Sequence, residues 1–318
     1  MNRGAMIAAA FACDALAGDP RVFPHPVRAI GLAITRGERG VRRFARGNRA
    51  GEALGGTLLA AGVIAASALG AQTAVRWGGR FGPDRFNATE VLLGWTTLAL
   101  RDLIAESDAV LAALERGDLA RARIQLARIV GRDCDALAAG EIARATIETL
   151  AESFCDGVVG PLYALAAGGV PLAFAFKAAN TLDSMIGHIE APYTDLGRSS
   201  ARIDDICCYV PARLGALALC LLAPIAGGSM RAAWHTWRRD GDLHASPNAG
   251  QMEAAMAGAL GVRLGGRNRY DGIARDTALL GPEFRYPGVA DVRRARTLVV
   301  AGACAAAWLA AVAARFHA

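Results

Sequence analysis

Residues 53–75 are ALGGTLLAAGVIAASALGAQTAV, and residues 297–314 are TLVVAGACAAAWLAAVAA. Neither run contains a charged residue, and about 20 such residues are enough for a helix to cross the hydrocarbon core of a bilayer. Of the 318 residues, 53% are hydrophobic and only 6% are aromatic. This apolar share is higher than soluble domains usually carry. The sequence therefore predicts a polytopic membrane protein, with 53–75 and 297–314 as its firm spans.

Four further segments are candidate spans, although each is short or carries a charge, a proline or a glycine pair. They are residues 4–18, 88–104, 158–176 and 206–226. Such interruptions need shelter inside a helix bundle, where neighbouring helices satisfy the exposed polar groups. The break Gly168-Gly169-Val170-Pro171 indicates that 158–176 is a re-entrant segment or a broken helical hairpin.

Arginines precede both firm spans. They are Arg36, Arg39, Arg42, Arg43, Arg46 and Arg49 before the first, and Arg293, Arg294 and Arg296 before the second. Cytosolic loops carry such an excess, so both flanks are expected in the cytosol. The amphipathic helices of 105–156, with Asp118 and Asp133 as expected N-caps, and the connection 227–296 form cytosolic layers. Strand-like alternation is nearly absent. The expected fold is all-α: a polytopic integral membrane protein with cytosolic amphipathic helices, forming one domain over 1–318.

The charge and cysteine patterns exclude several classes of protein. The 35 Lys and Arg residues outnumber the 29 Asp and Glu residues, but they cluster beside apolar runs, which is typical of membrane orientation and headgroup contact. No RNA- or DNA-binding module accompanies them, so no nucleic-acid partner is expected. The seven cysteines include no CxxC pair, and the sequence predicts neither a disulfide framework nor a zinc site.

Three carboxylates recur along the predicted helix that ends near Asp156. Glu148, Glu152 and Asp156 are spaced by four residues, which places them on one helix face. Like charges at this spacing repel by about 0.2–0.5 kcal/mol per pair, so a cation is expected between them. Two interpretations are open: a solvated acidic face paired with Arg144, or a Mg²⁺ site, because Mg²⁺ typically takes one or two carboxylates together with substrate phosphates.

A dense polar string, KAANTLDSMIGH at 177–188, follows an apolar segment directly. A helix there places Lys177, Asn180, Ser184 and His188 on one face. Because polar groups at a membrane boundary are costly, the string predicts a functional site. The alternative is an ordinary interfacial helix with a snorkelling lysine.

A second string, GRSSARIDD at 197–205, alternates guanidinium and carboxylate groups, and one more arginine follows within an apolar segment. The charged residues are Arg198, Arg202, Asp204, Asp205 and Arg213. Arginine forks bind phosphate or carboxylate in bidentate fashion, and the aspartates suit a cation or a general base. A mutual salt-bridge network is the competing interpretation.

Two polar motifs lie outside this region. In HASPNAG at 244–250, Ser246 is a natural N-cap with Pro247 next, and the helix is expected to stop near Gly261. Free N–H groups at such a helix end bind anions, so His244, Ser246 and Asn248 are candidate binding residues. In GDPRVFPHPV at 18–27 the prolines predict an extended turn that carries Asp19 and His25.

Six strings together resemble one family, the CobD/CbiB proteins of cobalamin biosynthesis, also called adenosylcobinamide-phosphate synthases. They are GDPRVFPHPV at 18–27, ESFCDGVVGPLYALAAGG at 152–169, KAANTLDSMIGH at 177–188, GRSSARIDD at 197–205, PARL at 211–214 and HASPNAGQMEAAMAGALGVRLGG at 244–266. No single string is decisive. Six in order over most of the chain make a highly specific match.

The resemblance implies a multi-pass enzyme of the bacterial inner membrane. It would use ATP to join a propionate carboxyl of adenosylcobyric acid to the amine of aminopropanol or its O-phosphate. Activation is needed because a carboxylate and an ammonium do not condense in water, and Mg²⁺ is the expected companion of ATP. No Walker-type loop GxxxxGK[ST] occurs, so ATP would be bound in another way. Other corrin-pathway membrane enzymes are candidate partners, beside the lipid bilayer.

Residue type assigns the expected roles. The catalytic candidates are Asp183, Lys177, Glu152 and Asp156, and the metal candidates are Asp204, Asp205, Glu152 and Asp156. The expected substrate and phosphate ligands are Arg198, Arg202, Arg213, Asn180, Ser246, Asn248 and His244, with His25 and Asp19 lining the site. The site is expected to open to the cytosol, which requires that 158–176 and 206–226 are not both simple full spans.

Three other classes remain as alternatives. A transporter for a corrinoid or another solute also carries charged residues within apolar segments, but two repeated halves with matched broken helices are not found. A phospholipid-type phosphotransferase would need the run DGxxAR, whereas Asp156-Gly157 leads into Val-Val-Gly-Pro. A purely structural membrane scaffold does not need so many ordered polar strings.

Overall fold

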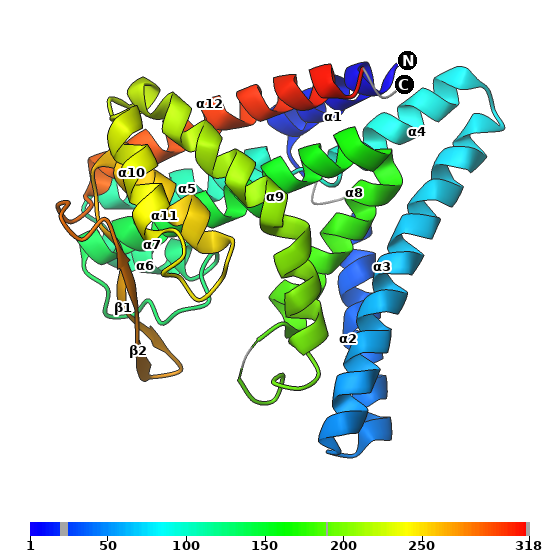
Figure 1. Ribbon diagram of the computed structural model, residues 1–318, viewed down its shortest axis with the longest axis horizontal. Coiled ribbons are helices and arrows are strands. Elements are labelled where there is room, and N and C mark those ends of the chain that lie inside the picture. Colours follow the sequence, from blue (N-terminus) through cyan, green and yellow to red (C-terminus); the bar gives the residue numbers. More distant parts are fainter. Residues whose placement is uncertain (20–24, 189, 316–318) are drawn as a thin grey trace. The chain divides into compact units, whose positions relative to one another are not determined.

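A computed structural model describes residues 1–19, 25–188 and 190–315, and helices dominate these ranges (Figure 1). The helices are α1 (Arg3–Ala17), α2 (Pro26–Ala45), α3 (Arg49–Gly79), α4 (Pro83–Trp95), α5 (Leu100–Glu115), α6 (Leu119–Leu126), α7 (Ala139–Phe154), the π-helical turn η1 (Cys155–Val159), α8 (Gly160–Ile186), α9 (Arg198–Leu222), the 3-10 turn η2 (Ala223–Ala226), α10 (Met230–Asp240), α11 (Ala249–Leu260) and α12 (Val289–Ala313). Two strands, β1 (Leu264–Tyr270) and β2 (Ile273–Leu280), form a hairpin.

These elements form two compact units. The first comprises residues 1–99, 160–208 and 307–318, and the second comprises 100–159 and 209–306. The final three residues, 316–318, lie outside the described ranges. The middle of the motif at 18–27, residues 20–24, also lies outside them, so its expected turn stays a prediction.

The first unit is organised around α3, which packs along α2, α4 and α8 (Figure 1). α2 and α3 run antiparallel and come unusually close. A Cβ added at Gly37 would lie 2.2 Å from Leu59 Cδ1, and one added at Gly55 would lie 2.5 Å from Val41 Cγ1. A larger residue at either position would have to displace the facing side chain. The same contacts fix the register, in which residue 37 lies opposite residue 59, and residue 41 opposite residue 55.

Helix α8 is broken where the sequence predicts a break. Gly169 has φ 69° and ψ −161°, which is not helical, and Pro171 follows inside the helix. Proline removes a backbone donor and clashes with the preceding turn. Arg3 of α1 donates from Nη1 to the carbonyl oxygen of Ala166 at 3.3 Å, so the neighbouring helix satisfies an acceptor beside the break. Whether 158–176 re-enters the membrane stays a prediction.

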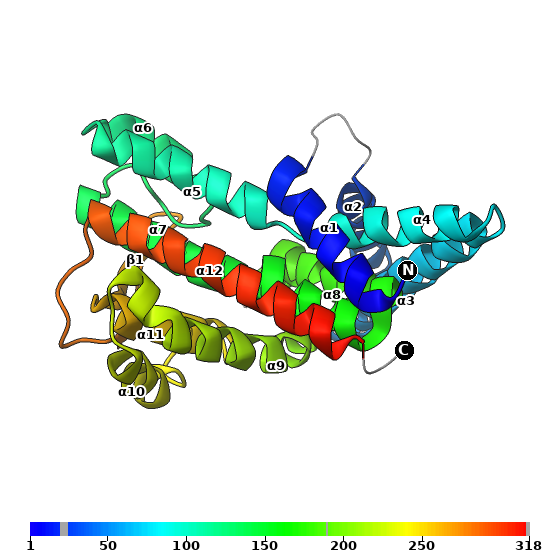
Figure 2. The same ribbon diagram turned by 90° about the horizontal axis from the view of Figure 1, so that it is seen from above.

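The second unit has α11 at its centre, where every residue from Ala249 to Leu260 is buried. α10 packs along α11, and α7 contacts α5, α6 and α11. α6 lies beside α5 after the connection at Gly117 and Asp118 (Figure 2). Asp118 caps α6 by accepting from the backbone N–H of Arg121 at 2.9 Å, as the sequence predicts.

The hairpin of β1 and β2 is a small addition to the all-α fold, which the helices of the described residues confirm. Its turn is Asp271-Gly272, with φ values of 50° and 78°, and Asp-Gly with two positive φ values is the preferred two-residue hairpin turn. Asp133, expected to cap a helix, instead accepts from the backbone N–H groups of Asp271 (3.2 Å) and Gly272 (2.8 Å). The loop before α7 thus fastens the hairpin, and Asp133 is a turn cap.

Within the described ranges, four helical stretches are long and apolar enough to cross a membrane: Arg49–Gly79, Ala139–Ile186, Arg198–Ala226 and Val289–Ala313. The firm span 53–75 lies within the first of these stretches, and the firm span 297–314 lies within the last except for residue 314. The candidates 4–18 and 88–104 do not, because α1 has 15 residues and the chain between α4 and α5 is not helical. The apolar segment 206–226 belongs to a longer helix that begins at Arg198.

Candidate functional site

The predicted site residues divide between the two units. Asp19, His25, Lys177, Asn180, Asp183, Arg198, Arg202, Asp204 and Asp205 lie in the first unit. Glu152, Asp156, Arg213, His244, Ser246 and Asn248 lie in the second.

In the first unit, the polar string forms the last turns of α8. Asn180 is buried, while Lys177 and Asp183 are half-buried. The hydroxyl groups do not project from the helix as ligands: Thr181 donates to the carbonyl oxygen of Lys177 at 2.7 Å, and Ser184 donates to that of Asn180 at 2.9 Å. The longer side chains, Lys177, Asn180 and Asp183, are consequently the ones suited to binding or proton transfer.

The carboxylate of Asp183 bends back over the end of α8. A Cβ added at Gly187 would lie only 2.0 Å from Asp183 Oδ1, so any larger residue would displace this carboxylate. The backbone N–H of Gly187 donates to the Asp183 carbonyl oxygen at 2.7 Å. The glycine in the string SMIG therefore leaves room for the Asp183 carboxylate, a contribution that residue type alone did not indicate.

The first turns of α9 present two exposed guanidinium groups, Arg198 and Arg202. Arg202 Nη1 lies 3.5 Å from Asp205 Oδ2, and these side chains are 78% and 28% exposed. Asp204 has a different neighbour, because Cys208 Sγ lies 3.6 Å from its Oδ2. The two adjacent aspartates thus point to different partners, as neighbouring residues on a helix do.

The connection between α8 and α9 is fixed to the arginine-rich end of α2 and α3. Arg49 Nε donates to Asp195 Oδ2 at 2.7 Å, and Arg42 donates to the Pro192 carbonyl oxygen at 3.1 Å. The hydroxyls of Thr57 and Ser199 lie 2.6 Å apart. The Arg49 hydrogen bond also lowers the pKa of Asp195. The end of α8 and the start of α9 therefore lie at the same end of α3 as the arginines that the sequence assigns to the cytosol.

Asp19 and His25 are also brought together. His25 Nε2 lies 3.1 Å from Asp19 Oδ2, and His25 Nδ1 accepts from the backbone N–H of Val27 at the start of α2. Nδ1 is an acceptor in this arrangement, which leaves Nε2 as the nitrogen that carries a proton toward the carboxylate. His25 thus has a structural capping role in addition to its expected place at the site.

In the second unit, the 244–250 motif forms a compact polar cluster. Ser246 Oγ accepts from the backbone N–H groups of Asn248 (3.3 Å) and Ala249 (3.2 Å), so it caps the chain although α11 begins at Ala249. His244 Nδ1 accepts from the N–H of Ser246 at 3.0 Å, and burial lowers the pKa of His244. Its imidazole is therefore neutral at pH 7. The helix ends at Gly261, as predicted.

Arg213 joins this cluster from α9. Its Nη1 donates to Asn248 Oδ1 at 3.3 Å, and its guanidinium lies 3.5 Å from the centroid of the Tyr209 ring. The aromatic face and the amide orient the guanidinium without neutralising it. Arg213 and Asn248, two residues predicted to bind phosphate, thus lie side by side.

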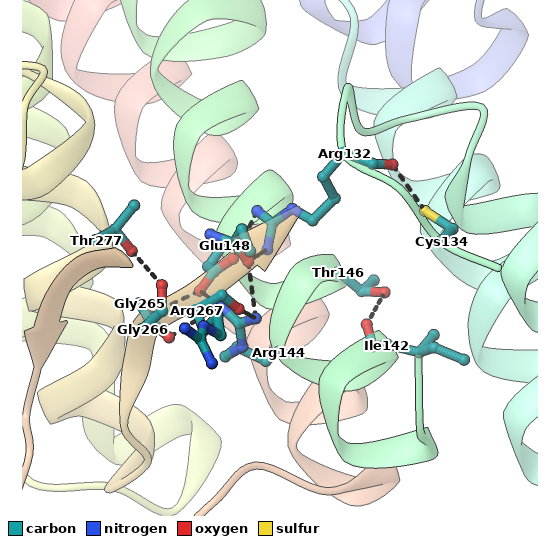
Figure 3. Close-up of polar contacts among 11 residues, drawn as sticks. Arg132, Cys134, Ile142, Arg144, Thr146, Glu148, Gly265, Gly266, Arg267 and Thr277 are labelled. Atoms are coloured by element: carbon teal, nitrogen blue, oxygen red, sulfur yellow. Dashed lines mark hydrogen bonds and ion pairs between the residues drawn. The ribbon is translucent and has the colours of Figure 1, made fainter. Parts of the chain in front are cut away.

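A buried ion network forms the polar core of the second unit (Figure 3). Glu148 Oε1 accepts from Arg144 at 3.0 Å and from the N–H of Gly265 at 2.8 Å, and its Oε2 lies 2.7 Å from Arg132 Nη2. Asn268 of β1 accepts from both arginines at 2.8 Å. Arg144 is only 2% exposed. The cation expected beside Glu148 is therefore arginine, and the network joins α7 to the hairpin.

Glu253 of α11 is a buried acid that the sequence reasoning missed. Burial raises its pKa well above the usual range, and the negative charges of Glu148 and Glu152 raise the pKa further, against the opposing fields of Arg132 and Arg144. The protonated form of Glu253 is therefore favoured in the folded chain relative to a carboxyl group in water. The available signal was its position in the apolar run MEAAMAGAL, where a charged residue is out of place.

The two other predicted carboxylates have different settings. Glu152 is exposed on α7, and Asp156 is half-buried in η1. Such π-helical turns inside longer helices occur frequently at functional sites. The three carboxylates differ in exposure, because Glu148 is buried, Glu152 is exposed and Asp156 is half-buried. Whether they act together on one helix face stays a prediction.

The fold and these polar groups define a class: helical membrane proteins whose long apolar helices carry acidic and basic residues at their ends and in their interiors. In such proteins ionisable residues at membrane depth mark functional sites. The known proteins that resemble this chain narrow the class.

Residues 7–299 match the family model described as CobD/Cbib protein. The chain is 49% identical over 276 residues to the cobalamin biosynthesis protein CobD of Geobacter metallireducens, covering 86% of both chains. It is 42% identical over 309 residues to the cobalamin biosynthesis protein CbiB of Salmonella typhimurium, covering 94% of both. No solved structure matches. The chain belongs to the CobD/CbiB family of cobalamin biosynthesis proteins.

Proposed function

We infer that this protein is an adenosylcobinamide-phosphate synthase. It joins a propionate carboxyl of adenosylcobyric acid to the amine of aminopropanol, or of its O-phosphate, as an amide. The observation that carries the proposal is the family match over residues 7–299, which includes all six polar strings in full and favours none of the three alternative classes. The relatives' names state cobalamin biosynthesis, and the amide-forming step is our proposal.

The reaction requires an activated carboxyl group, which ATP supplies, with Mg²⁺ to neutralise phosphate charge. The donor set fits such a pair. Arg198 and Arg202 are exposed guanidiniums suited to polyphosphate, and Asp204 and Asp205 offer the carboxylate oxygens that Mg²⁺ prefers. Because these two aspartates have different neighbours, one of them is expected to bind the ion and the other to hold Arg202.

The end of α8 supplies the residues proposed for the chemical step. Asp183, whose carboxylate occupies the space that a side chain at position 187 would fill, would accept a proton from the substrate ammonium, which is nucleophilic only after deprotonation. Lys177 would stabilise negative charge on the carboxyl oxygens. Asn180, buried beside them on α8, would orient a substrate amide or hydroxyl group.

The second unit supplies further proposed ligands. Arg213 and Asn248 form a ready-made anion contact, and His244, kept neutral by burial, would donate or accept a hydrogen bond without adding charge. Glu152 and Asp156 remain candidates for a metal ion or a base. Asp19 and His25 in the first unit remain proposed lining residues.

The proposed site faces the cytosol of a bacterial inner membrane. The support is the Arg49–Asp195 pair, which holds the α8–α9 connection at the arginine-rich end of α3. Substituting Cys for Ala191, an exposed residue of that connection, in a Cys-depleted variant tests this proposal. Labelling of the cysteine from the periplasmic side alone would contradict it.

A direct assay tests the proposed function. The purified chain in detergent is given adenosylcobyric acid, Mg·ATP and either aminopropanol or its O-phosphate, and the amide is detected by mass spectrometry. Product is expected with one or both amines, and none without ATP. Uptake of the corrinoid into proteoliposomes without amide formation would instead support the transporter alternative.

A further inference from the structure

An apolar groove of about 580 Å³ opens on the first unit between α2 and α3. Its walls include Ala29 and Ala33 of α2, and Gly62, Ala66, Gly70 and Ala74 of α3. The four α3 residues recur every fourth position and leave a smooth channel along that helix. The volume falls within the usual range of ligand pockets, about 300–1,000 Å³.

The groove lies on the most exposed of the membrane-length helices. The most apolar 18 residues of α3 have a mean hydropathy of 1.8, and only 17% of them are buried. In the stretch that contains α8, 61% of the corresponding 18 residues are buried. A helix of this composition faces hydrocarbon. The groove therefore opens toward lipid tails, and its natural occupant has an extended apolar chain.

Basic side chains lie beside the groove. Arg36, Arg39 and Arg43 of α2 are exposed and have neither an ion pair nor a side-chain hydrogen bond among the described residues. At 100° per residue they fall within an arc of about 60°, next to the face that carries Ala33. Arg42, in contrast, is paired with Glu38 at 2.9 Å.

The register of α2 and α3 sets the depth of these arginines. Because residue 37 lies opposite residue 59, and residue 41 opposite residue 55, the arginines flank the first turns of the apolar run at 53–75. That is the level at which a spanning helix meets lipid headgroups, where basic residues attract anionic lipids. The stripe of Arg36, Arg39 and Arg43 is thus suited to an anionic headgroup, and the apolar groove is suited to the acyl chain of the same lipid.

We propose that the groove and the arginine stripe form a single binding site for an anionic phospholipid, with an acyl chain in the groove and the phosphate at Arg36, Arg39 and Arg43. This site goes beyond the proposed enzymatic function and does not depend on it. A second copy of the chain fits less well, because a twofold contact through this face would bring the same unpaired arginines against each other.

The test titrates lipid into the purified full-length chain in detergent and counts bound molecules by native mass spectrometry. Phosphatidylglycerol and phosphatidylcholine with identical acyl chains are compared, with glycerophosphoglycerol as the headgroup without chains. One phosphatidylglycerol molecule is expected to bind saturably, at least about tenfold more tightly than phosphatidylcholine, and glycerophosphoglycerol is expected not to displace it.

Two pairs of variants separate the parts of the site. Arg36→Gln/Arg39→Gln/Arg43→Gln should remove the tenfold preference, whereas Arg76→Gln/Arg80→Gln/Arg85→Gln, which deletes three exposed arginines elsewhere in this unit, should retain it. Ala66→Leu/Ala74→Leu fills the groove and should abolish the saturable binding. Ala61→Leu/Ala65→Leu adds the same methyl groups outside the groove lining and should preserve it.

Several results would overturn the proposal: equal affinity for the two lipids, equal losses in both arginine triples, displacement of lipid by glycerophosphoglycerol, or a dimer that excludes lipid. If the variant Arg36→Gln/Arg39→Gln/Arg43→Gln has a lower thermal unfolding temperature than the natural chain, the single variant Arg39→Gln tests the phosphate contact instead. That variant should weaken phosphatidylglycerol binding about fivefold, and an unchanged affinity would contradict the site.

Discussion

Arginine–carboxylate pairs occur in both units but in opposite environments. In the second unit Glu148 (5% exposed side chain) lies 2.7 Å from Arg132 and 3.0 Å from Arg144. In the first unit Asp205 (28% exposed) lies 3.5 Å from Arg202 (78% exposed). Water screens the exposed pair, whereas the buried network satisfies charges that would otherwise be costly to bury. The buried network of the second unit stabilises the fold. The exposed pair of the first unit leaves the Arg202 guanidinium accessible to an anionic ligand.

The largest expected effect follows from breaking the buried network. Glu148→Ala leaves two arginines buried without their carboxylate, so we expect the free energy of unfolding to fall by about 3–5 kcal/mol. Chemical unfolding in detergent, monitored by circular dichroism, measures this change. Glu106→Ala is the matched control, because Glu106 (30% exposed) pairs with Arg128 (49% exposed) and its loss should cost at most about 1 kcal/mol. Equal losses would refute a structural role for the network.

The polar end of α8 should show the reverse behaviour. Asp183→Asn removes the proposed proton acceptor but preserves size, so amide formation should fall about a hundredfold or more with little change in unfolding temperature. Steady-state turnover and thermal unfolding are measured on one preparation. Thr181→Val, which loses only a hydroxyl bonded within its own helix, serves as the control. Retention of full activity by Asp183→Asn would remove Asp183 from the mechanism.

Glu253 makes the stability of the second unit depend on pH. Its pKa is raised in the folded chain, so its contribution to stability is intact below the unfolded pKa and is lost as pH rises toward the folded pKa. Glu253→Gln removes this loss, and its stability relative to the natural chain should increase with pH above about 4.3 by at most about 1.4 kcal/mol per pH unit. Unfolding temperatures at pH 5, 6, 7 and 8 measure the difference. Parallel curves for the two proteins would show that Glu253 is not held protonated.

The exposed arginines should produce the smallest change. Arg198→Gln/Arg202→Gln removes two groups proposed to bind phosphate, so the KM for ATP should rise about tenfold while the unfolding temperature stays the same. Arg121→Gln/Arg128→Gln, in the other unit, controls for lost charge. A lower unfolding temperature with an unchanged KM would mean that the α9 arginines are structural like those around Glu148.

Local rules predicted much of the architecture. The charge-free runs fall within α3 and α12, the break at Gly169 and the cap at Asp118 lie where glycine, proline and aspartate indicate, and α11 ends at Gly261. These features depend on residues close in sequence. The Asp271-Gly272 turn carried an equally local hairpin signal, but the flanking strands are rich in arginine and glycine rather than in Val, Ile and Thr, so the pattern was missed.

The arrangement of the site depended on contacts that no local rule provides. Glu148 binds the N–H of Gly265, 117 positions away, and Asp195 binds Arg49, 146 positions away. The spacing of four residues predicted that Glu148 acts together with Glu152 and Asp156. In the folded chain Glu148 belongs instead to the buried network with Arg132 and Arg144. The family resemblance depended only on the six sequence strings and their order, so it did not require any knowledge of the contacts between them.

Amide formation by the purified chain tests the central claim most directly. With adenosylcobyric acid, aminopropanol phosphate and Mg·ATP, we predict a product whose mass equals the sum of the corrinoid and the amine less one water. The product should form stoichiometrically with ATP consumption and be nearly absent with Asp183→Asn. A correctly folded protein that consumes no ATP and forms no amide with either aminopropanol or its phosphate would contradict the proposed function.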